Sequence, residues 1–150
     1  KQKKFLAGSQ VAGIVAQPLM GWISDKYGRK IVLIPAMTLL SLLYFLLYFS
    51  VDGIPLIINV LVMGCFVYSL HTIFIAAAMD TVDGKSQSTV VSLIYAATII
   101  GFISPFIAGA LSDFVGQPNG LKMPFIYSGI VALISTITLV FVKLPRNRYQ

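Results

Sequence analysis

The sequence predicts an all-α membrane protein, a polytopic bundle of five transmembrane helices in one domain over residues 1–150. In composition, 57% of its residues are hydrophobic and 11% are charged, whereas soluble domains carry about 25% charged residues. All the acids are Asp and lie at or near the ends of apolar runs, as do nearly all Lys and Arg. Because charge at the centre of a bilayer is costly, this segregation indicates a multi-pass integral protein, which we expect in the plasma (cytoplasmic) membrane.

Five apolar runs have the length of about 20 residues that a helix needs to cross the hydrocarbon core. They predict spans at about residues 5–24, 31–51, 54–79, 89–112 and 124–142. Their length and the absence of two-residue alternation favour helices over barrel strands. The connectors are short, so consecutive helices are expected to be antiparallel neighbours.

Lys and Arg gather at the connectors on one side of the expected bundle. That side includes the first connector, the third connector and the end of the chain, whereas the other side holds Lys122 and the basic start of the chain. Since cytoplasmic loops carry an excess of Lys and Arg, we place the first side in the cytoplasm. The net charge of +6 is thus dispersed over membrane-edge loops, which argues against a nucleic-acid partner, because phosphate binding needs a gathered basic face.

The sequence lacks the residues of an enzyme active site. His71 is the only His and Cys65 the only Cys, and no carboxylate lies inside a span. These residues do not supply a nucleophile with its base, paired acids or a set of metal ligands. We therefore expect neither an enzyme nor a metal site.

The first connector, in the stretch "GWISDKYGRK", combines three cations with one carboxylate. Gly21 allows another helix to approach closely, and Gly28 permits a left-handed backbone in a tight turn. Asp25 is unusual among Lys26, Arg29 and Lys30, and a carboxylate there suits the positive N-terminal end of a neighbouring helix. The alternative is an ordinary basic cytoplasmic loop.

This stretch resembles a loop of the major facilitator superfamily, with the pattern G-x-x-x-D-[RK]-x-G-R-[RK], and it fills every fixed position. The loop joins the second and third helices of that family and recurs between the eighth and ninth. The resemblance implies half of a general-substrate-transporter-like fold, with the five spans as helices two to six or eight to twelve. We favour eight to twelve, because the third span lacks the Arg that N-terminal halves often carry.

The resemblance implies a partial chain of a secondary transporter that moves a small solute by alternating access, with the remainder of the transporter as a partner. The motif would be a cytoplasmic gate element. Asp25 would cap a helix of the other half when the protein faces outward, and Arg29 would pair with Asp80 or Asp83. The alternative is that the two latter acids only cap their turn.

The fourth span carries small residues and a proline at a spacing of four. Ala97, Gly101, Pro105 and Gly109 form one smooth stripe, and Pro105 is expected to bend the helix. Ordinary helix packing is the alternative. The stripe resembles the fifth or eleventh helix of the family. Ser104 stands where antiporters often carry Gly, which weighs against antiport and favours symport.

The resemblance also implies that the first, third and fourth spans line the substrate path, while the second and fifth face lipid. The polar candidates on the path are Gln10, Gln17, Asn59, His71, Tyr95 and Thr98. Asn59 and His71 need not share a helix face. His71 either relays protons or makes a structural hydrogen bond. We expect no cofactor, and coupling to a proton or another ion stays open.

A second class of function remains open beside the transporter. A non-transporting membrane scaffold or receptor could retain the same fold, and fold does not determine function. The identity of the solute does not follow from these residues.

Overall fold

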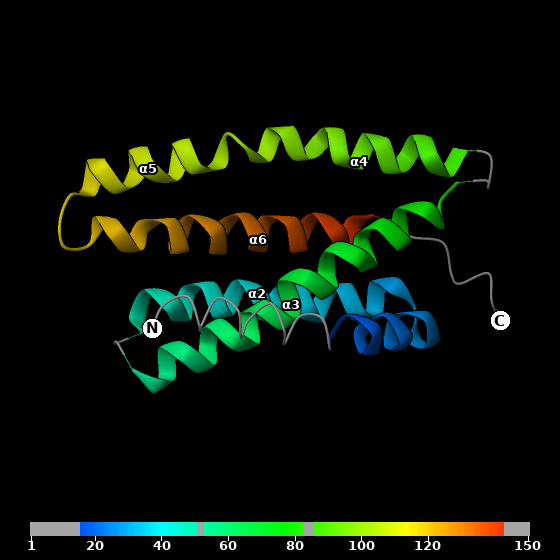
Figure 1. The fold of residues 1–150 in the computed structure, drawn as a ribbon, viewed down its shortest axis with the longest axis horizontal. Coiled ribbons are helices and arrows are strands. Elements are labelled where there is room, and N and C mark those ends of the chain that lie inside the picture. The colour runs from blue at the N-terminus through cyan, green and yellow to red at the C-terminus, as the bar shows by residue number, and fades with distance from the viewer. Residues whose placement is uncertain (1–15, 51–52, 83–85, 143–150) are drawn as a thin grey trace.

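The computed structural model describes residues 16–50, 53–82 and 86–142, and the regular elements in these ranges are helices (Figure 1). A helical segment at residues 16–27 precedes the first labelled helix. The further elements are α2 (Arg29–Phe49), α3 (Ile54–Met79), α4 (Gln87–Gly101), α5 (Ser104–Val115), the short 3-10 helix η2 (Gly120–Lys122) and α6 (Met123–Phe141). The predicted all-α class is confirmed.

Four stretches of the described residues are long and apolar enough to cross a membrane. They are Arg29–Phe49, Ile54–Met79, Gln87–Val115 and Gly120–Phe141. Of the predicted first span, residues 5–15 lie outside the described residues, and the rest is helical. The candidate Gln10 also lies outside them.

The predicted first connector, residues 25–30, is much shorter in the structure. The helical segment continues to residue 27 and α2 begins at Arg29, so that only Gly28 interrupts the helix. The Gly28 N–H still donates to the Ser24 carbonyl at 3.0 Å, and Gly28 then turns the chain with φ 104° and ψ 142°. Charged residues indicated a loop here, but at a membrane surface they are accommodated on helix ends.

The fourth predicted span is divided between α4 and α5, directly before Pro105. Pro105 has no N–H to donate to the preceding turn, whereas the first turn of a helix needs no such bond. At the junction, the N–H groups of Phe102 and Phe106 donate to carbonyls three residues back, both at 3.1 Å. The structure thus interrupts the helix at this junction, next to the Pro105 at which the sequence predicts a bend.

α2 is the packing centre of the described bundle. It lies along α6 and crosses α3 (Figure 1), and the shared core contains Leu33 and Leu40 of α2, Ile73 of α3 and Leu139 of α6. The predicted second span therefore has one side packed against α3 and α6, and only its other side can face lipid. Its exposed side chains, including Leu42 at 56%, lie on the face away from this core.

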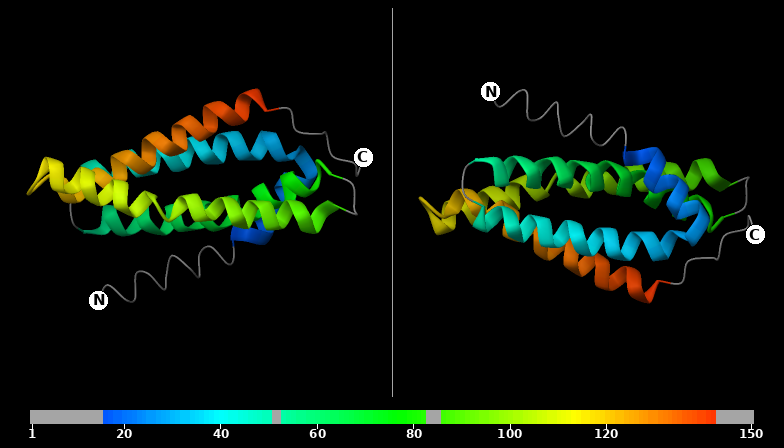
Figure 2. Two further views of the ribbon diagram at one scale, coloured as in Figure 1. Left: turned by 90° about the horizontal axis from the view of Figure 1, so that it is seen from above. Right: turned by 90° about the horizontal axis from the view of Figure 1, so that it is seen from below.

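α4 and α5 form a long rod beside the other helices. The rod meets α3 near the start of α4 and meets α6 near the hairpin after α5 (Figures 1 and 2). No described side chain of the rod is buried. The rod thus presents an uncovered apolar side along its whole length.

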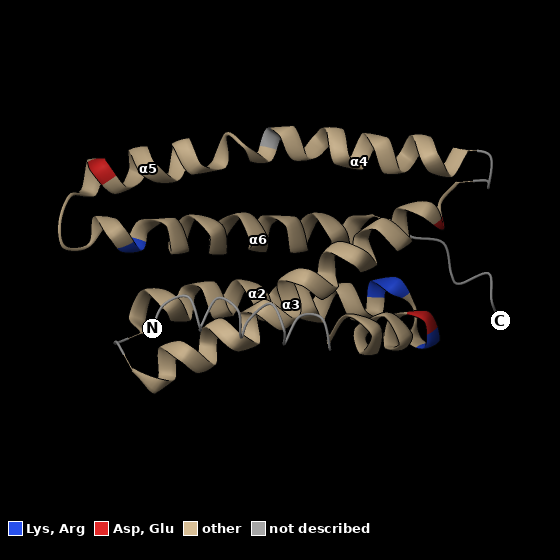
Figure 3. Ribbon diagram, viewed as in Figure 1, with Lys and Arg blue, Asp and Glu red and all other residues tan. Residues whose placement is uncertain are grey.

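The described charged residues lie at the two ends of the bundle (Figure 3). At one end of the bundle α2 begins, and α3 and α6 terminate. We call this end "the Arg29 end". It contains Asp25, Lys26, Arg29, Lys30 and Asp80, while Asp113 and Lys122 are near the opposite end. The described helices hold no Lys, Arg, Asp or Glu between these ends, as a bilayer requires.

Candidate functional site

The site is built around Arg29, the first residue of α2. Asp25 lies near the end of the helical segment and Arg29 directly follows the turn at Gly28, and the two side chains form an ion pair across this turn. The Arg29 side chain is 13% exposed, whereas that of Asp25 is 62% exposed. The Arg29 side chain is thus largely buried, whereas the Asp25 side chain lies at the surface of this end of the bundle.

Arg29 also joins this turn to the end of α3. Its Nε donates to Asp80 Oδ2 at 2.9 Å, and its Nη1 donates to the hydroxyl of the buried Ser24 at 3.3 Å. Asp80 is the C-cap residue of α3, where a carboxylate is disfavoured by the negative end of the helix dipole. The guanidinium offsets that effect. Of the two acids expected as partners, Asp80 makes the contact, and Asp83 lies outside the described residues.

The two lysines of the motif go to different places. Lys30 Nζ donates to the carbonyls of Val140 and Val142, at 2.6 and 2.8 Å, at the end of α6. Lys26 stays on its own segment, with its Nζ 5.1 Å from the ring centre of Trp22 and 5.6 Å from that of Tyr27. Sequence reasoning missed the contact of Lys30. The preference of Lys for helix C-termini was the available signal, but it does not say which helix.

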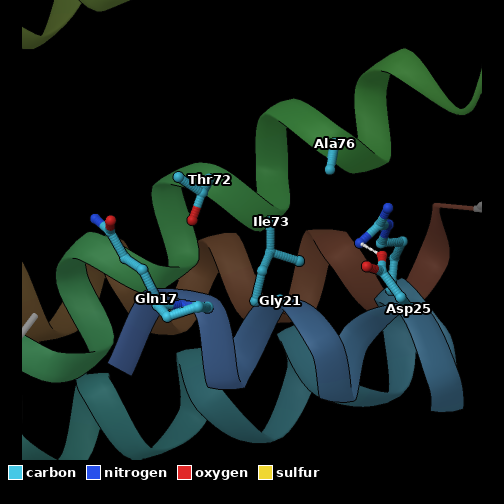
Figure 4. Close-up of a pocket in the computed structure, with 8 residues that line it drawn as sticks. Gln17, Gly21, Asp25, Thr72, Ile73 and Ala76 are labelled. Carbon is cyan, nitrogen blue, oxygen red and sulfur yellow. Dashed lines mark ion pairs between the residues drawn. The ribbon is translucent and has the colours of Figure 1, made fainter. Parts of the chain in front are cut away.

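A groove of about 430 Å³ runs between the helical segment and α3 (Figure 4). Gln17 and Thr72 lie toward one end of it, and Asp25 with its ion pair lies at the other. Gly21 and Ala76 line the middle. A Cβ added at Gly21 would meet no atom within 4 Å, so the close approach expected at Gly21 has no partner among the described residues.

The proposed path residues separate into two places. Asn59 is only 4% exposed and donates from Nδ2 to the Leu43 carbonyl at 3.3 Å, between α3 and α2. Its Oδ1 is buried and finds no hydrogen-bond partner within the described part of the chain. Asn59 therefore belongs to a helix interface and does not join the exposed His71.

His71 of α3 and Tyr95 of α4 do come together, and Thr98 lies about one turn further along α4. The rings of His71 and Tyr95 are 6.3 Å apart at a tilt of 55°, and Tyr95 is 54% exposed. The Thr98 hydroxyl donates to the Tyr95 carbonyl at 2.5 Å. Gln17 lies one helix away and donates to the Tyr68 carbonyl at 3.4 Å.

The small-residue stripe of the fourth span lies on the uncovered rod. Ala97 is exposed, and a Cβ added at Gly101 or Gly109 would meet nothing within 4 Å. Pro105 is exposed on the same rod. Within the described ranges, no three His, Cys, Asp or Glu side chains form a metal-binding group.

Two curated relatives cover most of this chain. It is 27% identical over 143 residues to "Multidrug resistance protein 2" of Bacillus subtilis (strain 168), with 91% of this chain and 33% of the relative covered. It is 26% identical over 137 residues to "Tetracycline resistance protein, class H" of Pasteurella multocida, with 90% and 33% covered. The chain thus spans about a third of the length of these relatives.

No solved structure matches the chain significantly. The family description that does match, over residues 5–150, is that of the Major Facilitator Superfamily. This match covers the charged turn, the groove and all the described helices. The chain therefore belongs to the Major Facilitator Superfamily.

Proposed function

We propose that these residues are part of a secondary transporter that carries a small organic solute across the membrane by alternating access. The supporting observation is the arrangement at the Arg29 end, where one cation contacts both the exposed Asp25 and the α3 cap Asp80. Resistance to drugs in the names of both relatives supports a drug-like solute. No cofactor is needed for such a carrier, and a proton or ion gradient would drive it.

Asp25 is the gate residue of this proposal. It lies at one end of the groove, and Gly21 leaves the neighbouring wall free of side chain. A helix from the remainder of the transporter could enter the groove and place its positive N-terminal end on the Asp25 carboxylate. Loss of that contact opens the cytoplasmic side, while the bond between Arg29 and Asp80 keeps this half of the protein intact.

The solute path runs along the uncovered side of α3 and α4. His71 and Tyr95 offer two polar-tipped rings there, and Gln17 lines the adjacent groove. Flat rings and amide groups suit an uncharged or weakly polar organic solute. The smooth stripe of Ala97, Gly101 and Gly109 would receive the other half of the carrier.

Transport by the full-length protein in liposomes tests the proposal. We expect accumulation of tetracycline or a fluorescent drug when a pH gradient is imposed, and the sign of the effective gradient separates symport from antiport. Asp25→Asn should change the balance between inward- and outward-facing states. Saturable binding without flux under any gradient would instead establish the scaffold or receptor alternative.

A further inference from the structure

The end of α6 is held by a side chain from another helix. A helix leaves its last four carbonyls without partners inside the helix, and such groups need satisfaction at the edge of a membrane. α6 ends at Phe141, and Val142 turns into an extended conformation with φ −70° and ψ 126°. The Lys30 ammonium group donates to the carbonyls on either side of Phe141, those of Val140 and Val142.

Lys30 and Arg29 are consecutive residues that reach two different helices. Successive residues of a helix point about 100° apart, and α2 lies between α3 and α6. Arg29 therefore contacts Asp80 at the end of α3, while Lys30 contacts the end of α6. Two consecutive residues at the start of α2 thus contact the ends of both neighbouring helices.

Asp25, on the helical segment before Gly28, lies at this same end of the bundle. A shift of the α6 end would be transmitted through Lys30 to the neighbouring Arg29, which pairs with Asp25. The positive charge of Lys30 also opposes the negative end of the α6 dipole. Lys26 is a natural comparison, because it carries the same charge in the same motif and contacts only rings of its own segment.

We propose that Lys30 is a positioning residue of the gate, which anchors the end of α6 to the Gly28 turn so that α2, α3 and α6 move as one body. This inference rests on the proposed transport function. Arg29 is the arm that reaches α3, and Lys30 is the arm that reaches α6.

The first test compares Lys30→Gln, Lys30→Arg and Lys26→Gln in the full-length protein, with Cys65 replaced by Ser and one Cys placed at Val142. Loss of a charge at a helix end is expected to raise the labelling rate of that Cys by about fivefold in Lys30→Gln. Lys30→Arg should stay within about twofold of the unaltered protein, since it keeps the cation and its donors. Lys26→Gln should not change the rate.

Transport by the same variants, without the Val142 substitution, separates positioning from simple capping. Lys30→Gln should lower the maximal rate by about fivefold with KM within about twofold, because the solute path is untouched. Lys30→Arg should restore at least half of the rate. Unchanged labelling in a folded Lys30→Gln protein, or increased labelling with a normal maximal rate, would overturn the proposal.

A second measurement does not depend on the folding of Lys30→Gln. Spin labels at the exposed Ile31 and at Val142, with Lys30 retained, should show one distance distribution with and without solute. A distribution that changes when solute is added would mean that α2 and α6 do not move together. If the unaltered protein transports nothing, the proposed function fails. If the unaltered protein transports and Lys30→Gln shows no defect, only the inference about Lys30 is refuted.

Discussion

The helix α2, which begins at the Arg29 end, and the α4–α5 rod are about equally apolar, but they differ completely in their packing. The span of α2 has a mean hydropathy of 2.3 and is 44% buried, whereas Gln87–Val115 has 2.1 and is 0% buried. At the Arg29 end, side chains cross from one helix to another. On the rod, the hydroxyls of Ser92 and Thr98 donate to carbonyls of their own helix.

This difference shows that apolarity places a helix in the membrane without choosing its neighbours. Lipid tails are as apolar as Leu, so helices associate through close packing and polar contacts. α2 has both: the Ser41 hydroxyl donates to the Gly129 carbonyl at 2.8 Å, and the ring of Phe45 lies over Gly129. The rod carries comparable small residues, and in our proposal the remainder of the transporter packs on them.

The largest effect is expected from Arg29→Gln, which removes the cation that pairs with both acids at the Arg29 end. Asp25 and Asp80 would lose their shared cation, and a hydrogen bond to a charged group contributes about 2 kcal/mol. We expect a loss of transport of at least about tenfold and a clear fall in thermal stability of the purified full-length protein. Normal stability in this variant would mean that the ion pairs do not hold the helix ends together.

A matched pair of glycine substitutions comes next, with Gly129→Leu on the buried side and Gly109→Leu on the rod. A Cβ at Gly129 would lie 3.1 Å from the Phe45 ring, whereas one at Gly109 meets nothing within 4 Å. Overpacking at Gly129 should reduce stability by about 2 kcal/mol. Thermal unfolding should show this loss in Gly129→Leu alone.

Transport assays of the same two variants test whether the rod is a packing surface. If the rod receives another part of the transporter, Gly109→Leu should impair transport although this chain offers its side chain open space. Full activity in Gly109→Leu would show that the stripe is not a packing surface.

A moderate effect is expected from His71→Gln on the uncovered side. The variant loses the imidazole beside the Tyr95 ring, so we expect KM for the solute to rise by about fivefold with stability unchanged. Uptake measured over a range of solute concentrations checks this. An unchanged KM together with an altered pH profile would instead favour a proton relay at His71.

The smallest effect is expected from Lys26→Gln. Exposed cation–π contacts contribute about 0.5–1 kcal/mol, and the two such contacts of Lys26 are with Trp22 and Tyr27 of its own segment. Transport should stay within about twofold of the unaltered protein. A loss as large as that of Arg29→Gln would show that the motif acts through its net charge rather than through particular contacts.

The class of the protein and much of its helix layout can be read from the residues along the chain. The third span was predicted at residues 54–79, and α3 has the bounds Ile54–Met79. Hydropathy is a sum over neighbouring residues and the need to satisfy backbone groups in lipid is local, so these features can be read along the chain. The ion pair of Arg29 was also within reach, because few acids stand at the ends of the spans.

Packing between distant helices sets which helix is central and where single polar side chains point. Asn59 faces α2 instead of the open side, Lys30 reaches α6, and α2 has a buried face that its uniform run of apolar residues does not reveal. The rotation of each helix depends on packing with partners far away in the sequence. Where every face of a helix is apolar, no local pattern records that choice.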